Sequence, residues 1–133
     1  VIGRSGKRIA DGRFTVGQQE LASAYRQVQL EYNPVPNLTR LLQNYPNPFN
    51  PETWIPFQLN QDAEVSVSIY NVSGRLVRTF PIWFRSAGIY LSQDKAIYWN
   101  GRTDNGETVS SGVDFYQLNA CDYSSTSRMV ILK

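Results

Sequence analysis

The fold of this chain is decided by the stretch Ala63-Glu64-Val65-Ser66-Val67-Ser68-Ile69-Tyr70, which has the clearest periodicity in the sequence. Apolar Val65, Val67 and Ile69 alternate with polar residues. Successive side chains of a strand point to opposite faces, so this alternation predicts a strand with one buried and one solvated face. We expect Val65, Val67 and Ile69 to lie in the core.

Similar short runs follow and precede this stretch. The expected strands are 54–59, 63–70, 75–80, 89–91, 96–99, 112–120 and 126–132. Pro56 indicates an edge strand, and Asn71-Val72-Ser73-Gly74 indicates a hairpin turn. No helical pattern separates the runs, which predicts an all-β, Ig-like antiparallel β-sandwich of about seven strands. We expect Trp99, Phe115 and Ile131 to be buried as well.

The N-terminal part has a different character. Residues 1–13 carry a net charge of +3 and several glycines, as expected for either a solvated flexible segment or a binding arm. A capping box at Thr15 and an apolar stripe with helical spacing predict one amphipathic helix over about 16–32. The helix would pack on this domain or on a missing one, or recruit a partner. Pro34 and Pro36 make the linker 33–37 stiff, so we divide the chain into an N-terminal part at 1–37 and a sandwich at 38–133.

Composition excludes several classes of function. The 133 residues contain no histidine and one cysteine, Cys121, so catalysis through histidine, zinc sites containing histidine and an internal disulfide are ruled out. The acidic residues form no recognisable pair, and we expect no enzyme, no metal and no cofactor. A net charge of +2 argues against nucleic acid, and no apolar run is long enough for a membrane span. The start at Val1 indicates a piece cut from the C-terminus of a longer protein.

The segment Asn44-Tyr45-Pro46-Asn47-Pro48-Phe49-Asn50-Pro51 is unusual because prolines alternate with Asn and Phe. Proline fixes the backbone and Asn side chains close local turns. We expect Phe49 and Tyr45 to plug one end of the sandwich. The segment then acts as a rigid clamp at the entry to the domain, or as a peptide surface that a partner recognises.

This segment resembles the opening motif of the C-terminal sorting domains carried by proteins of the type IX secretion system, and of the related Ig-like domain of the flagellar hook-capping protein. The resemblance continues in order through 69–75, 99–102 with 105–106, 111–113 with 115–116, and 129–133. The family pattern is carried by Tyr45, Pro46, Asn47, Pro48, Phe49, Asn50, Gly74, Arg75, Trp99, Gly101, Gly106 and Gly112.

The resemblance implies a non-catalytic sorting module that directs an N-terminal passenger through the outer membrane. Its expected partner is the outer-membrane secretion machinery, and its expected destination, reached via the periplasm, is the medium or the cell surface. Anchoring of the passenger at the cell surface is a second expected role of the module. A terminal strand would offer backbone hydrogen-bonding groups and a charged tip to the receptor. The expected recognition residues are Arg128, Met129, Val130, Ile131, Leu132 and Lys133.

Three positions depart from the family pattern. Asp114 stands where an aromatic residue is usual, and we expect its charge to discourage edge-to-edge pairing. Cys121 replaces a glycine and places a thiol in a turn, where it is open to oxidation. Asn100 replaces a common aspartate.

Two other functions compete with sorting. One is an assembly module that makes protein–protein contacts, as in the hook cap. The other is a carbohydrate-binding module, because sugars stack on exposed aromatic rings and Trp83 beside Phe84 offers such a platform. The competing interpretation of Trp83 is a loop folded over the end of the core.

Overall fold

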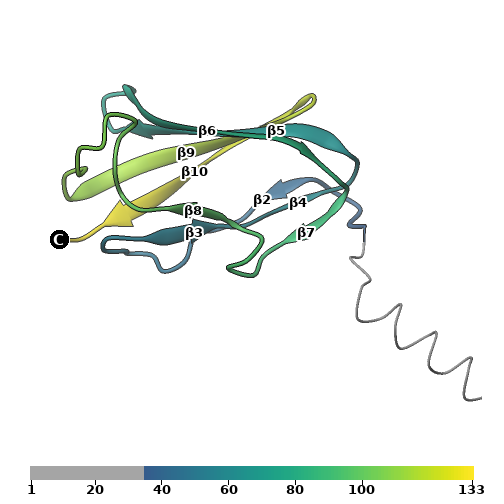
Figure 1. Cartoon of the computed structure of the whole chain (residues 1–133), viewed down its shortest axis with the longest axis horizontal. Coiled ribbons are helices and arrows are strands. Elements are labelled where there is room, and N and C mark those ends of the chain that lie inside the picture. The colour runs from purple at the N-terminus through teal and green to yellow at the C-terminus, as the bar shows by residue number, and fades with distance from the viewer. Residues whose placement is uncertain (1–34) are drawn as a thin grey trace, which may run out of the picture. The chain divides into compact units, whose positions relative to one another are not determined.

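The structure, a computed structural model, describes residues 35–133 as two layers of antiparallel strands (Figure 1). The expected all-β antiparallel architecture is therefore confirmed. The helix expected over 16–32 lies outside the described residues, as do residues 33 and 34 of the linker. Within 35–133 there is no helix of the length and apolar character that crossing a membrane requires.

One layer is a four-stranded sheet built around the stretch that decides the fold. Its strands are β5 (Ala63–Asn71), β6 (Leu76–Arg85), β9 (Gly112–Ala120) and β10 (Tyr123–Ile131), in the order β10-β9-β5-β6. The hairpin of β9 and β10 is in register from Gly112 opposite Ile131 to Ala120 opposite Tyr123. The C-terminal strand is thus one edge of the sheet, and β6 is the other.

The second layer consists of two small sheets. These are β2 (Arg40–Leu41), β4 (Phe57–Leu59) and β7 (Gly88–Tyr90) in one sheet, and β3 (Thr53–Ile55) and β8 (Ile97–Trp99) in the other. The run 54–59, expected as one strand, is divided between them at Pro56. Proline has no N–H to continue a ladder, so the chain leaves one sheet there and enters the next.

The core lies between the layers. Val65, Val67 and Ile69 are buried as expected, as are Trp99 and Ile131. The second layer contributes Ile55, Phe57 and Leu59, which all face inward. The inward-facing side chains of both layers therefore form a single hydrophobic core.

Strand β9 corrects two expectations. Phe115 is half-buried on the outward face, while its neighbours Asp114 and Tyr116 point inward with 7% and 0% of their surface exposed. Asp114 also cannot protect an edge, because β9 lies between β10 and β5. Each face of β9 carries both polar and apolar side chains, so its sequence does not indicate which face is buried. Pairing with β5 decides this.

Strand β6 corrects the expectations for its own length and for Trp83. The strand extends beyond the expected 75–80 to Arg85, so Trp83 and Phe84 lie in an edge strand and not in a loop over the core. Their exposures are 68% and 57%. A register shift beside Val65 accompanies Trp83, whose φ is 69°.

Candidate functional site: the clamped C-terminal strand

The opening motif lies directly against the C-terminal strand. Phe49 and Ile131 form a parallel bridge, although 82 positions separate them in sequence. The Phe49 N–H donates to the Val130 carbonyl at 3.0 Å, and the Leu132 N–H donates to the Phe49 carbonyl at 3.1 Å. The start and the end of the domain are therefore joined through their backbones.

Two side chains extend this clamp along β10. The Asn47 Oδ1 accepts a hydrogen bond from the Val130 N–H at 2.9 Å, and the Gln43 Nε2 donates to the Arg128 carbonyl at 3.1 Å. The outer edge of β10 is thereby occupied at Arg128, Val130 and Leu132. The expectation that this part of the strand offers free backbone groups to a receptor is wrong for the folded domain.

Phe49 is the plug that the sequence predicts. It is 2% exposed, and its ring centroid lies 5.6 Å from that of Trp99. Gly101 follows Trp99 closely with φ at 77°, and a Cβ there would lie 2.6 Å from the Pro51 carbonyl oxygen. Glycine is thus required here, both for the backbone angle and for the close approach of the motif.

Tyr45 does not share the role of Phe49. It is half-buried and pairs with Trp54 through two backbone hydrogen bonds of 2.9 and 2.8 Å. The two rings stack at a centroid distance of 6.2 Å, and the Tyr45 hydroxyl donates to the Leu91 carbonyl. Tyr45 therefore fastens the motif to the small sheet rather than filling the core. The exposed residues of the motif are Pro46, Asn47, Pro48, Asn50 and Pro51.

A buried polar network holds the beginning of the motif. The Tyr116 hydroxyl accepts from the Asn44 N–H at 2.9 Å and donates to the Leu42 carbonyl at 2.8 Å. The Asn44 side chain donates to the Thr53 hydroxyl at 3.0 Å, which donates to the Pro46 carbonyl at 3.1 Å. Burial raises the pKa of the Tyr116 hydroxyl. Sequence reasoning missed this network because it joins three separated segments.

The terminal residues differ in what they present. Met129 and Ile131 are 0% and 1% exposed, so their side chains belong to the core. Leu132 is 57% exposed, and Arg128 and Lys133 are also exposed. The Lys133 N–H donates to the Ser111 hydroxyl at 3.0 Å, which fixes the last residue beside the start of β9.

The remaining family residues form turns. Gly74, with φ at 87°, lies in the β5–β6 turn, where the Asn71 Oδ1 accepts from the Arg75 N–H at 3.0 Å. Gly106, with φ at 86°, lies in the loop between β8 and β9, and Gly112 opens β9. Both glycine turns have room for a Cβ, so conformation rather than space favours glycine there.

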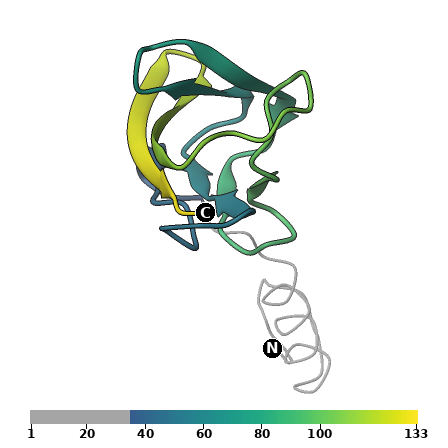
Figure 2. The same ribbon diagram turned by 90° about the vertical axis from the view of Figure 1, so that its left-hand side faces the viewer.

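These turns gather at one end of the sandwich. Figure 1 places the β5–β6 turn, the loop after β8 and the C-terminus at the left, and Figure 2 looks onto that end. The backbone of Asp104 donates to the Val77 carbonyl at 3.0 Å, and the Arg78 Nε lies 3.4 Å from the Asp104 carboxylate. The family turns, which are scattered in sequence, thus lie at the same end of the sandwich as the chain end.

Polar side chains at this end of the sandwich serve mainly to close local turns. Among residues 35–133, no three His, Cys, Asp or Glu side chains gather as a metal site would require. Asn100 closes a local turn, because its Oδ1 accepts from the Arg102 N–H at 3.1 Å and from Arg78 at 3.3 Å. Cys121 is exposed in the β9–β10 turn with φ at 54°, which explains why glycine suits this position.

Comparison with known families agrees with this arrangement. The model of the "Secretion system C-terminal sorting domain" matches residues 43–132, which begin at the clamp and end at the terminal strand. No curated protein matches the chain.

Two similar solved structures come from Porphyromonas gingivalis. Dimeric latent PorU has a TM-score of 0.53 and 17% identity, over 90% of this chain and 10% of that chain. PorZ, described as a surface component of the type IX secretion system, has a TM-score of 0.47 and 21% identity, over 80% of this chain and 12% of its own. This chain therefore spans about a tenth of the length of either protein. The likeness to PorU supports the fold alone.

Proposed function

Because the chain belongs to the family of secretion system C-terminal sorting domains, we propose that residues 42–133 address a passenger protein to the outer-membrane export machinery. The family module is a sorting signal for type IX secretion, and proteins that carry it reach the cell surface or the medium. The domain itself supplies no chemistry to the passenger. Within this export route we propose two steps, namely transit of the passenger through the periplasm and recognition of the domain by an outer-membrane receptor.

One observation carries the proposal in structural terms. The opening motif and the C-terminal strand are hydrogen-bonded to each other through Phe49, Val130 and Leu132. Each segment supplies backbone hydrogen-bond partners to the other. The address is therefore a folded surface and not a linear peptide, and a receptor that reads it tests whether the domain has folded.

The clamp favours one of two possible modes of receptor binding. Strand addition to β10 would require the receptor to displace the motif from Val130 and Leu132, at the loss of several backbone hydrogen bonds. Side-chain recognition needs no such displacement. We therefore assign recognition to the exposed residues Arg128, Leu132 and Lys133, with Met129 and Ile131 holding them in position from the core.

A fusion experiment tests the sorting function. A periplasmic reporter joined to residues 42–133 should leave a cell that has the type IX machinery and stay inside a strain that lacks it. Circular dichroism of the purified fusion verifies that the domain has folded. Retention of a folded fusion by the competent strain would refute the proposal.

A matched pair of variants tests the proposed surface. Arg128→Ser with Lys133→Ser removes two exposed charges at the clamped end, and Arg85→Ser with Lys95→Ser removes two exposed charges elsewhere. Exposed charges seldom contribute more than about 1 kcal/mol to stability, so both variants should stay folded. Export should fall at least tenfold in the first variant and remain unchanged in the second. Equal export by both would remove these two side chains from the receptor contact.

A further inference from the structure

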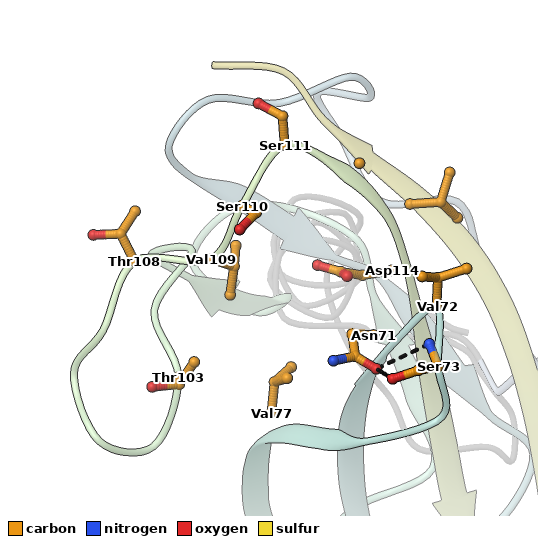
Figure 3. A pocket seen from close by; sticks show the side chains of 12 residues that line it. Asn71, Val72, Ser73, Val77, Thr103, Thr108, Val109, Ser110, Ser111 and Asp114 are labelled. Carbon is orange, nitrogen blue, oxygen red and sulfur yellow. Dashed lines mark hydrogen bonds between the residues drawn. The ribbon is translucent and has the colours of Figure 1, made fainter.

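A cavity of about 370 Å³ opens beside β9, near the C-terminus but on the inward side of the strand. The β5–β6 turn forms one wall, and the loop between β8 and β9 forms the opposite wall (Figure 3). Aliphatic side chains are prominent in it, namely Val72, Val77, Val109 and Val113. The clamp described above does not use this space.

Asp114 is the unexplained residue of this cavity. Its carboxyl group points from β9 into the space between Val77 and Val109 (Figure 3). The residue is 7% exposed, and its Oδ2 has no hydrogen-bond partner among residues 35–133. Buried carboxylates are normally paired or hydrogen-bonded, because an unpaired one destabilises the fold. The arrangement therefore points to a group that joins Asp114 from the cavity.

The surroundings define the charge of that group. No Lys or Arg lines the cavity, and Asp114 is the one ionisable side chain among its lining residues. Burial raises the pKa of the Asp114 carboxyl, as expected where no cation compensates its charge. Ser110 and Thr108 add hydroxyl oxygens to the walls. A positively charged donor with an apolar stem complements both parts of the lining.

We propose that this cavity binds an aliphatic primary ammonium group, such as that of a lysine side chain or a free alkylamine, against the carboxylate of Asp114. The methylene stem contacts the valine walls, and the ammonium group compensates the negative charge of the carboxylate from the cavity side, without contacting the enclosed Oδ2. Volume does not limit entry, since ligand sites of about 300 Å³ and above accommodate larger molecules. The proposal is independent of the sorting function.

Two other cations suit the site less well. Calcium requires six to eight oxygen ligands and usually several carboxylates, whereas Asp114 provides the one carboxylate here. A guanidinium group binds best to two open carboxylate oxygens, and the Oδ2 of Asp114 is enclosed. An ammonium group is compact and needs no bidentate geometry.

Titration of the full 133-residue chain with n-butylammonium chloride tests the proposal. Binding followed by ¹⁵N chemical shifts should be saturable in the millimolar range, with the largest shifts at the backbone amides of Asn71, Val109 and Asp114. Isosteric Asp114→Asn keeps the shape of the site and should weaken binding at least tenfold. Asp122→Asn, which removes an exposed carboxylate from the β9–β10 turn, should leave binding unchanged. Neutral n-butanol should bind at least tenfold more weakly to the parent chain.

Further arms distinguish the source of the ammonium group. An acetylated, amidated lysine peptide that binds at least tenfold more tightly than n-butylammonium identifies a polypeptide ligand, and equal affinity identifies a free amine. Both results support the proposal. Preference for calcium or for the matching arginine peptide would overturn it. No saturable shift with any probe would also overturn it, because the Asp114 carboxyl would then have no ligand in the cavity.

Discussion

The neighbouring strands β5 and β9 face the same core from the same sheet, but the sequence predicts the buried face of β5 only. The inward positions of β5 include Val65, Val67 and Ile69, and its outward positions are more polar. The inward positions of β9 are Asp114, Tyr116, Leu118 and Ala120. A strand with one purely apolar face specifies its own orientation, whereas β9 takes its orientation from β5.

The pairing explains how this happens. Residues Val65 to Asn71 of β5 lie opposite Ala120 to Asp114 of β9, so each inward residue of β5 fixes an inward residue of β9. A shift by one residue would bury Phe115 and expose Tyr116. The shift would also break the hydrogen bonds from the Tyr116 hydroxyl to the motif. The polar network thus helps to select the register.

The largest effect is expected for Val67→Asp in β5. This change places an unpaired charge at a fully buried position, and we expect a loss of more than about 4 kcal/mol and no folded domain. Thermal unfolding followed by circular dichroism measures it. The neighbouring Ser68→Asp on the outward face is the control and should keep a cooperative transition. A parent-like transition for Val67→Asp would mean that β5 does not orient the sheet.

Tyr116→Phe tests the contribution of β9 to the buried polar network that holds the beginning of the opening motif. The variant keeps the ring but leaves the Asn44 N–H and the Leu42 carbonyl without their partner, at a cost of about 1 to 3 kcal/mol. Urea unfolding gives the change in the free energy of unfolding. Tyr70→Phe on the outward face of β5 should cost less than about 0.5 kcal/mol. Equal effects of the two changes would contradict a special role for the buried hydroxyl.

The same contrast shows what the sequence can predict. Periodicity predicts the buried face of β5, the expected run 112–120 has the bounds of β9, and proline at position 56 indicates a discontinuity. The plug Phe49 and the family turns are also predictable, because proline and glycine constrain the backbone locally. Contacts over a long separation are not, and these include the clamp of Asn47 on Val130 and the bonds of Tyr116. They depend on the register between strands, which no local pattern records.

Asp114→Asn is expected to stabilise the domain at pH 7, because it removes a buried charge without changing the shape of the side chain. Burial raises the folded-state pKa of Asp114 above its ordinary value of 3.8, so the folded state binds the proton more tightly than the unfolded state. This carboxyl therefore lowers stability as pH rises from about 3.8 through its folded-state pKa.

The difference between Asp114→Asn and the parent chain should accordingly grow as pH rises from about 3.8 through the folded-state pKa of Asp114 and be smallest below that range. Urea unfolding across this range, without added amine, measures it. Asp122→Asn provides the comparison for loss of an exposed carboxylate. A difference that shrinks as pH rises would show that the Asp114 carboxylate is favourably paired in the folded state.

The smallest effect is expected for Phe115→Gln, and it separates the two possible registers of β9. In the observed register Phe115 is half-buried on the outward face, so a polar side chain of similar length should cost less than about 1 kcal/mol. In the shifted register Phe115 would fill the core, and the same change would cost about 3 kcal/mol or more. Leu118→Gln is the matched change at a buried position of the same strand and should be severe. Urea unfolding of both variants decides between the registers. In the observed register Leu118→Gln lowers the free energy of unfolding much more than Phe115→Gln does, whereas in the shifted register the two losses would be similar or their order would reverse.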